Sequence, residues 1–191
     1  NKITGKTRML IINSPQTPTG GVLKKEELKA IADLAIDHDF WVYSDEVYST
    51  LAYDEPFQSI ASIPGMLDRT IMVDCASKAY AMTGWRIGYT VVKRELAAQL
   101  VKLHQMTLTN IPVFIQEAAL KALELRHKIA DKMRKDYRRR ADLTCKILSK
   151  TKLKFTKPDA PFYFFPQFDN LDSERFAFSL LDKGVSVTPG T

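Results

Sequence analysis

Short apolar runs and amphipathic stretches alternate along the first half of the chain. The apolar runs predict strands at residues 7–15, 40–48, 69–77 and 85–92. Residues 24–39 carry apolar side chains at helical spacing, with glutamates near the start of the pattern. Strands alternating with helices are typical of an α/β sheet, mostly parallel and covered on both faces. In such sheets the chemistry gathers in loops beyond the strand ends.

After Lys93 the pattern changes, and apolar residues recur at helical spacing over long stretches. It predicts helices at 94–104, 113–125 and 128–150, then a proline-interrupted strand pair at 152–168, a helix at 173–184 and a short strand at 185–190. We therefore expect two parts. Residues 1–110 form an α/β domain, and residues 111–191 form connecting helices followed by a smaller α+β domain.

The composition is that of an ordinary soluble globular protein. The chain has 191 residues, of which 45% are hydrophobic and 26% are charged. No apolar run approaches the length of a membrane span, and the first residues lack the features of a secretory signal. The two cysteines, Cys75 and Cys145, lie far apart and not in a metal-binding spacing. We expect a cytoplasmic protein with no membrane partner and no metal site.

The formal net charge of +6 raises the possibility of a polyanionic partner. The basic residues concentrate at 126–143, where apolar residues recur at helical spacing among them. Such a pattern is more typical of the solvated face of an amphipathic helix than of a nucleic-acid-binding arm. No groove-reading motif accompanies the charge, so we expect no nucleic-acid partner.

Four polar side chains at strand ends suggest a common chemistry. Lys78 follows the third apolar run, and Arg86 lies eight residues later. An amine whose charge is disfavoured by burial and by a nearby cation can attack a carbonyl, while a guanidinium binds phosphate. Asp45 ends the second run, and Tyr48 follows it. Singly, these residues fit a solvated lysine, a helix cap and a core tyrosine. Together they suit a phosphorylated aromatic aldehyde such as pyridoxal phosphate.

Three stretches carry a resemblance to a known family. They read NSPQTPTGG at 13–21, SDEVY at 44–48 and SKAYAMTGWRIGY at 77–89, and the last is the most specific. Over nearly its whole length the chain resembles the class I/II aminotransferases, which are fold-type I pyridoxal-phosphate-dependent enzymes. The resemblance implies that residues 1–110 are part of the large cofactor-binding domain. It also implies that residues 111–191 hold connecting helices and a truncated small C-terminal domain.

The resemblance also implies roles for individual residues. Lys78 matches the lysine that forms an imine with the aldehyde of pyridoxal 5'-phosphate and then moves a proton at the substrate Cα. Asp45 matches the partner of the pyridine nitrogen, and Tyr48 matches the donor to the phenolic oxygen. Arg86 matches a phosphate-binding arginine. The expected substrates are an amino acid and a 2-oxo acid, and the expected assembly is a homodimer.

Two cofactor-binding positions depart from the family pattern. Thr17 stands where the family has an asparagine that hydrogen-bonds the ring oxygen, and threonine has a shorter reach. Cys75 stands where a phosphate-binding serine is common, and a thiol is a weaker donor. These departures keep open another pyridoxal-phosphate reaction, such as that of a β-lyase, cyclase or oxidase, beside aminotransfer. A non-catalytic binding module with the same fold is a third alternative.

The resemblance implies that the chain is the later half of a larger enzyme. Family members carry a long N-terminal portion that binds phosphate and stacks on the cofactor ring. They also carry an arginine, beyond the position of the final residues VTPGT, that binds the substrate carboxylate. We therefore expect residues 1–191 to be inactive alone and their parent to be active.

Overall fold

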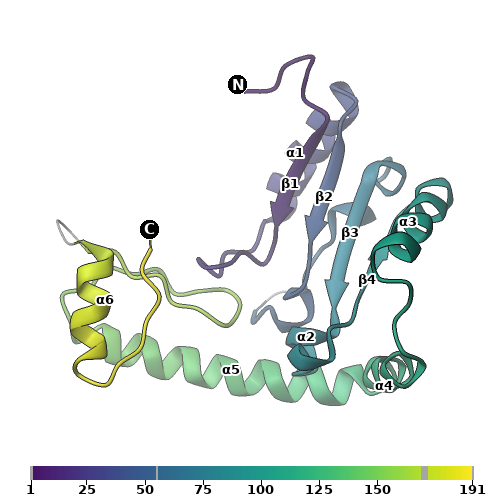
Figure 1. Ribbon diagram of the computed structural model, residues 1–191. Helices are drawn as coiled ribbons and strands as arrows, with labels where there is room; N and C mark the ends of the chain where they lie inside the picture. Colours follow the sequence, from purple (N-terminus) through teal and green to yellow (C-terminus); the bar gives the residue numbers. More distant parts are fainter. Residues whose placement is uncertain (1, 55, 169–171, 191) are drawn as a thin grey trace.

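A four-stranded sheet forms the centre of the computed structural model, which describes residues 2–54, 56–168 and 172–190 (Figure 1). The strands are β1 (Met9–Asn13), β2 (Trp41–Asp45), β3 (Thr70–Cys75) and β4 (Gly88–Val91), and they lie side by side in that order. β1 pairs with β2 and β2 with β3 in parallel, whereas β4 runs antiparallel to β3. The predicted α/β fold with a mostly parallel sheet is confirmed.

Helix α1 (Lys25–Asp37) covers one face of this sheet. Its start is stabilised by Glu27, whose Oε2 accepts a hydrogen bond of 2.8 Å from the Lys24 backbone N–H. Its apolar side chains pack with the sheet in a core whose buried members are Leu28, Ala32, Ala35, Phe40, Val42, Ile60 and Met66. Fully burying a leucine or phenylalanine contributes roughly 1.5–3 kcal/mol, so this core fixes the helix on the sheet.

The prediction that helices cover both faces of the sheet is wrong for the part of the chain that the structure describes. Met9 and Ile11 of β1 remain 43% and 69% exposed. Strands β1, β2 and β3 lie side by side in chain order, and right-handed connections between such strands lie on one face of the sheet. Helix α1 occupies that face, and the connection from β2 to β3 contains the short 3-10 turns η1 (Ser49–Leu51), η2 (Ile60–Ser62) and η3 (Leu67–Arg69). Among the described residues, these connections therefore bring no helix to the face opposite α1.

The helices predicted after Lys93 are confirmed, with small shifts of their ends. The elements that follow β3 and β4 are α2 (Ala76–Ala79), η4 (Thr83–Trp85), α3 (Arg94–Thr107), α4 (Val113–Glu124), α5 (Arg126–Leu148) and α6 (Ser173–Leu181). Figure 1 shows α5 running from α4 past α2, below the sheet, to the region of α6. Within the described ranges, no helix combines the length and the hydrophobicity needed to cross a membrane.

The strands predicted near the C-terminus are wrong. The expected pair at 152–168 is reduced to a single antiparallel bridge between Lys154 and Gln167, and residues 185–190 form no strand. Three prolines, at 158, 161 and 166, interrupt the first segment, and proline has no backbone N–H to donate to a ladder. A smaller α+β domain over residues 111–191 therefore stays a prediction.

The segment at 158–163 instead bonds to loops of the first half. The backbone N–H of Asp159 donates to the Gly20 carbonyl at 3.0 Å, and that of Tyr53 donates to the Asp159 carbonyl at 2.8 Å. Gly20 has a φ of +74°, and a Cβ placed there would collide with the Pro158 side chain. A glycine is therefore required at this junction.

Replacing this glycine tests the junction. We expect Gly20→Ala to lower the free energy of unfolding of the complete gene product by about 1–3 kcal/mol, because alanine disfavours the left-handed backbone conformation. The added methyl group also meets Pro158. Gly5→Ala is the matched control, since no atom lies within 4 Å of a Cβ placed there. Urea unfolding measures the free energy of unfolding of both variants. Equal values for Gly20→Ala and Gly5→Ala would contradict the close approach of Gly20 to Pro158.

Candidate functional site

The parallel pairing brings the carboxyl ends of three strands to one edge of the sheet. Asn13 lies opposite Asp45, and Asp45 lies opposite Val73. The Asn13 side chain joins two parts of this edge, since its Nδ2 donates to the Asp45 carbonyl at 3.3 Å and its Oδ1 accepts from the Thr17 backbone N–H at 2.7 Å. The loop that carries Thr17 is thereby held beside the end of β2.

Asp45 and Tyr48 occupy the turn that follows β2. The half-buried Asp45 carboxylate accepts a hydrogen bond of 3.3 Å from the backbone N–H of Val47. The chain then turns into η1, where the Leu51 N–H donates to the Tyr48 carbonyl at 2.9 Å. Tyr48 is buried. A 3-10 turn thus follows this strand, and the Tyr48 side chain at its start is directed inward.

Lys78 lies in the short helix α2, which begins directly after β3, with Cys75 as its N-terminal cap residue. The half-buried Lys78 Nζ lies 5.5 Å from the centre of the Tyr48 ring and 5.9 Å from the centre of the Phe162 ring. Both distances are in the range in which a cation is attracted to an aromatic face. The structure thus brings Lys78 and Tyr48 together from different strand ends.

Arg86 projects from the turn that joins α2 to β4. Its backbone is left-handed, with a φ of +55°, and η4, which it follows, packs against α2. Its exposed guanidinium donates through Nη1 to the Thr83 carbonyl at 2.9 Å. A guanidinium has several further N–H donors, so this bond leaves capacity to bind an anion.

Cys75 and Thr17 reach the same region of the molecule. The Cys75 backbone N–H donates to Oδ1 of Asp74 at 2.6 Å, and the exposed Thr17 lies in the loop beside Asn13. The contacts recorded among the described residues join Thr17 to Asn13 and Arg86 to Thr83, but neither of them to Lys78. The roles of these residues stay predictions.

Sequence reasoning missed two kinds of site residue. The sequence pattern indicates only a loop at Asn13, whereas its amide bridges that loop to β2. Phe162 and Tyr163 were placed in a strand, although Phe162 packs against Tyr48 with ring centres 5.6 Å apart. The aromatic run FYFF beside two prolines was the available signal, because it does not alternate as a half-buried strand would.

Buried acids lie directly behind the site. Glu46 is 4% exposed, and its Oε1 accepts hydrogen bonds from Ser44 at 2.8 Å and Ser59 at 2.7 Å. Burial raises the pKa of Glu46, and the charges of Asp74 and Asp45 raise it further, against the lowering effect of the two serines. Burial likewise raises the pKa of Asp74. Two acids whose charged forms are disfavoured by burial therefore lie beside Asp45.

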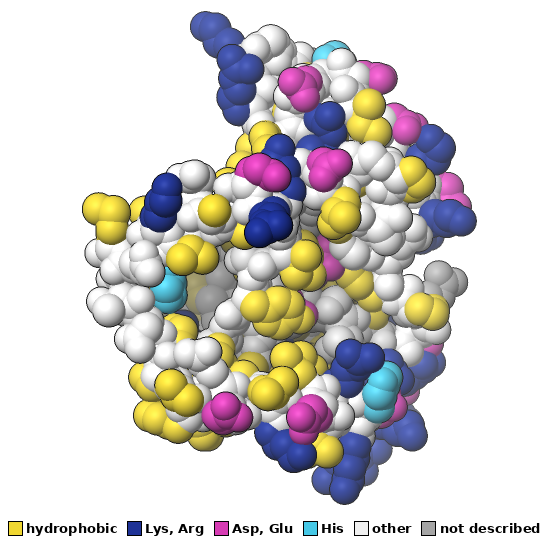
Figure 2. All heavy atoms as spheres, turned by 90° about the vertical axis from the view of Figure 1, so that its right-hand side faces the viewer, with side chains coloured by type: hydrophobic (Ala, Val, Ile, Leu, Met, Phe, Trp, Pro, Cys, Tyr) yellow, Lys and Arg dark blue, Asp and Glu magenta, His cyan; other side chains and the backbone are white. Residues whose placement is uncertain are grey.

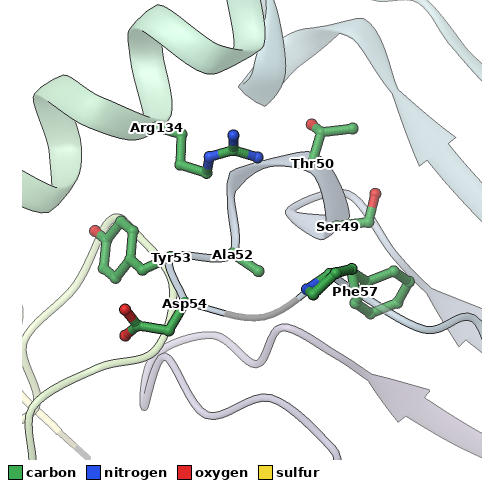
Figure 3. A pocket seen from close by; sticks show the side chains of 8 residues that line it. Ser49, Thr50, Ala52, Tyr53, Asp54, Phe57 and Arg134 are labelled. Atoms are coloured by element: carbon green, nitrogen blue, oxygen red, sulfur yellow. The ribbon is translucent and has the colours of Figure 1, made fainter. Parts of the chain in front are cut away.

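A cavity of about 490 Å³ opens beside this site (Figure 3). It is lined by Ser49, Thr50, Ala52, Tyr53, Asp54, Pro56, Phe57 and Arg134. The guanidinium of Arg134 extends from α5 toward Thr50 in Figure 3, and its Nη2 also pairs with Asp131 at 2.8 Å. None of the six predicted site residues lines this cavity, so it lies next to the Lys78 site and is distinct from it.

Comparison with known proteins gives a consistent result along the whole chain. A family model described as "Aminotransferase class I and II" matches residues 1–191. An aspartate aminotransferase from Pyrococcus abyssi is 45% identical over 195 residues, which cover 99% of this chain and 50% of the relative. An arginine–pyruvate transaminase from Pseudomonas aeruginosa is 42% identical over 192 residues, covering 98% of this chain and 49% of the relative.

A solved structure has the same fold. The crystal structure of an aromatic aminotransferase from Pyrococcus horikoshii matches with a TM-score of 0.94 and 44% sequence identity. The match covers 100% of this chain and 52% of that protein. The chain therefore spans about half the length of the relatives it matches.

The buried Glu46 predicts a pH dependence of stability. Because its pKa is raised above 4.5 in the folded state, the folded protein binds this proton more tightly than the unfolded chain. The resulting stability is present below pH 4.5 and is lost as the pH rises through the raised pKa. Glu46→Gln retains an acceptor for Ser44 and Ser59 but cannot ionise. We expect it to gain stability relative to the parent between pH 4.5 and 7.

The expected gain is about 1.4 kcal/mol for each unit by which the folded pKa is raised. Urea unfolding of the complete gene product at both pH values measures it. Glu117→Gln on the exposed face of α4 is the matched control, since it removes a carboxylate without removing a buried one. If the stability of Glu46→Gln depended on pH in the same way as that of the parent, the raised pKa of Glu46 would be contradicted.

Proposed function

We propose, since the chain belongs to the family of class I and II aminotransferases, that the complete gene product is a pyridoxal-phosphate-dependent aminotransferase. It moves an amino group between an amino acid and a 2-oxo acid. The observation that carries the proposal is the position of Lys78 Nζ against the Tyr48 ring, at the strand edge that holds Asp45. The aminotransferase names of the relatives support the reaction class.

The donor set at this edge fits pyridoxal 5'-phosphate. Lys78 offers an amine for the aldehyde, Asp45 a carboxylate for the pyridine nitrogen, and Tyr48 a phenol for the ring oxygen. Arg86 offers an exposed guanidinium for the phosphate, Cys75 caps the helix that carries Lys78, and Thr17 follows β1 beside Asn13. When bound, the cofactor supplies an electron sink for the charge left at the substrate Cα.

The residues of this chain have separate roles in the proposed reaction. With the cofactor bound, Lys78 would hold its aldehyde group through the amine, and the same amine would carry the proton to and from the substrate Cα. The rings of Tyr48 and Phe162 exclude water from one side of that amine, which strengthens the electrostatic interactions around it. Asp45 would hold the pyridine nitrogen and favour its protonated form.

Thr17 supports a second reaction type as an alternative to aminotransfer. A threonine at this position holds the ring oxygen less firmly than an asparagine, and the tuning of that oxygen affects which bond of the substrate reacts. A β-lyase, cyclase or oxidase would use the same Lys78 and Asp45. Product analysis with several amino acids and 2-oxoglutarate separates these reactions, because only an aminotransferase forms glutamate. A protein that neither binds the cofactor nor forms product would be a non-catalytic module.

The rest of the enzyme completes the site in this proposal. Residues 1–110 belong to the large cofactor-binding domain, and residues 111–191 comprise connecting helices and a small C-terminal domain. Because the chain spans about half of its relatives, we propose that the other half supplies further phosphate ligands and the group that binds the substrate carboxylate. Cys75 and Cys145 are both free thiols, which supports a cytoplasmic setting.

An exposed apolar surface supports a homodimer. We define the α3–α4 surface by its exposed apolar residues, which are Val101, Leu103, Met106, Leu108, Val113, Phe114 and Leu120. Figure 2 views the molecule from the side of Figure 1 on which these helices lie, and it shows many hydrophobic side chains around a hollow. Exposed apolar residues in this number support a contact with another protein surface.

Replacing the lysine tests the central assignment of this proposal. We expect Lys78→Ala to reduce turnover with an amino acid and 2-oxoglutarate on the order of a thousandfold or more, because one amine serves as both nucleophile and proton carrier. Lys93→Ala is the matched control, since its ammonium also lies against an aromatic ring, that of Trp41, at 4.9 Å. Steady-state kinetics of the complete gene product measure both. Near-parental turnover in Lys78→Ala would refute the assignment.

A charge placed on the α3–α4 surface tests the dimer. We expect the complete gene product to sediment as a dimer, and Met106→Glu together with Phe114→Glu to weaken association about tenfold or more. Leu67→Glu is the matched control, because Leu67 is an exposed apolar residue outside this surface. Analytical ultracentrifugation measures the dimer dissociation constant. A loss of folding stability without dissociation would show that the surface is covered within one chain.

A further inference from the structure

The loop that follows β1 contains a turn closed by its own backbone. The Gln16 N–H donates to the Gly21 carbonyl, and the Gly20 N–H donates to the Gln16 carbonyl, both at 2.8 Å. Thr17 lies within this turn, which we define as residues 16–21. Because the turn is closed on itself, the place of Thr17 at the strand edge depends on how the turn is attached to the rest of the protein.

Hydrogen bonds attach the turn at both of its ends. The hydroxyl of the buried Ser14 accepts a hydrogen bond of 3.0 Å from the Leu23 N–H, which closes the base of the loop. The Gly20 carbonyl accepts one of 3.0 Å from the Asp159 N–H. These bonds hold the two ends of the turn, but they do not act on Thr17 directly.

The side chain of Asn13 makes the bond that ends on Thr17. Its Oδ1 accepts from the Thr17 N–H at 2.7 Å, and its Nδ2 donates to the Asp45 carbonyl at 3.3 Å. One short, half-buried side chain thus meets a donor in the turn and an acceptor at the end of β2. An amide suits this place because it is a neutral group that both donates and accepts.

Asp45 is held in place without this amide. It lies in β2, between its partners Asn13 of β1 and Val73 of β3 in the parallel ladder. Its carbonyl also accepts a hydrogen bond of 3.1 Å from the Ser14 N–H. Loss of the Asn13 amide would therefore displace Thr17 and leave Asp45 where it is.

We infer that Asn13 is a positioning residue, which places the Thr17 hydroxyl for the ring oxygen of pyridoxal 5'-phosphate at the correct distance from Asp45. The oxygen and the nitrogen belong to one rigid ring, so the groups that hold them must match its dimensions. A threonine side chain is short, and a displaced backbone cannot be corrected by a change of rotamer. The inference rests on the proposed function, because it concerns the contacts that the proposal gives to Thr17 and Asp45.

A double-mutant cycle on cofactor affinity tests the inference. The complete gene product is freed of cofactor and titrated with pyridoxal 5'-phosphate. The dissociation constant is measured for the parent, Asn13→Ala, Thr17→Val and the double variant, and valine keeps the branched shape of threonine without its hydroxyl. We expect Asn13→Ala to weaken binding about 3- to 10-fold in the parent. In the Thr17→Val background we expect less than about twofold, because the group that Asn13 positions is already absent.

Ser14→Ala is the matched control, because it removes a hydrogen bond from the same loop without removing the bond to the Thr17 N–H. We expect its dissociation constant to stay within about twofold of the parent value. Asn13→Gln is a second variant, which keeps both polar groups of the amide but moves them by one methylene group. It should weaken binding with the same dependence on the Thr17 hydroxyl. Thermal unfolding establishes that each variant keeps the fold.

A second readout needs no cofactor. Hydrogen exchange of the cofactor-free protein is measured by mass spectrometry on the peptides that contain Thr17. Two of its neighbours, Pro15 and Pro18, have no amide hydrogen, so few other amides contribute to the signal. We expect exchange at Thr17 to become faster on the order of tenfold in Asn13→Ala and to stay unchanged in Ser14→Ala. Unchanged exchange in Asn13→Ala would overturn the inference.

The outcomes separate the inference from the proposal on which it rests. If Thr17→Val weakens cofactor binding and Asn13→Ala does not, the inference is wrong and the proposed function stands. Equal weakening by Asn13→Ala with and without the Thr17 hydroxyl would also overturn it, since Asn13 would then act independently of Thr17. An unchanged affinity in Thr17→Val would overturn the inference together with the contact that the proposed function gives to Thr17. A parent that binds no cofactor would overturn the proposed function itself.

Discussion

The parallel pairing of β1 with β2 and of β2 with β3 is the constraint on which the site depends. It places Asn13 opposite Asp45 and Asp45 opposite Val73, so that the carboxyl ends of three strands meet at one edge. The loop, the 3-10 turn and the short helix that follow these strands then start from neighbouring points. Lys78 reaches Tyr48 for this reason, although thirty residues of sequence separate them. A shift in strand register would separate these groups, because every side chain would change faces.

The contacts at this edge also join the two halves of the chain. Phe162 packs between Tyr48 and Tyr137, and the backbone around Asp159 bonds to Gly20 and Tyr53. The same interactions therefore shape the surroundings of the lysine and hold the C-terminal segment in place. The arrangement carries an electrostatic cost, since Glu46 and Asp74 are buried acids whose pKa values are raised mainly by desolvation. The cost comes first from burial, because desolvation disfavours the charged form of each acid.

The strands and the central residues of the site could be predicted because their signals are local. Apolar runs that end at Asp45 and Cys75 indicate both the strand and its boundary, and Lys78 follows within the next turn. Asn13 and Phe162 could not be assigned in this way, because their contacts cross long stretches of sequence. The apolar face of β1 was read as buried, since a sequence pattern shows that a face is apolar but not which element covers it. The strand pair predicted at 152–168 does not form, because its prolines lack the backbone N–H groups that donate the hydrogen bonds between paired strands.

The central claim is that this strand edge holds pyridoxal 5'-phosphate on Lys78, and chemical trapping tests it most directly. The complete gene product, loaded with the cofactor, is reduced with borohydride, digested and analysed by mass spectrometry. The account predicts that the mass of one reduced pyridoxal phosphate group is found on the peptide that contains Lys78. Modification of another lysine, or absence of any stable adduct at saturating cofactor, would contradict it.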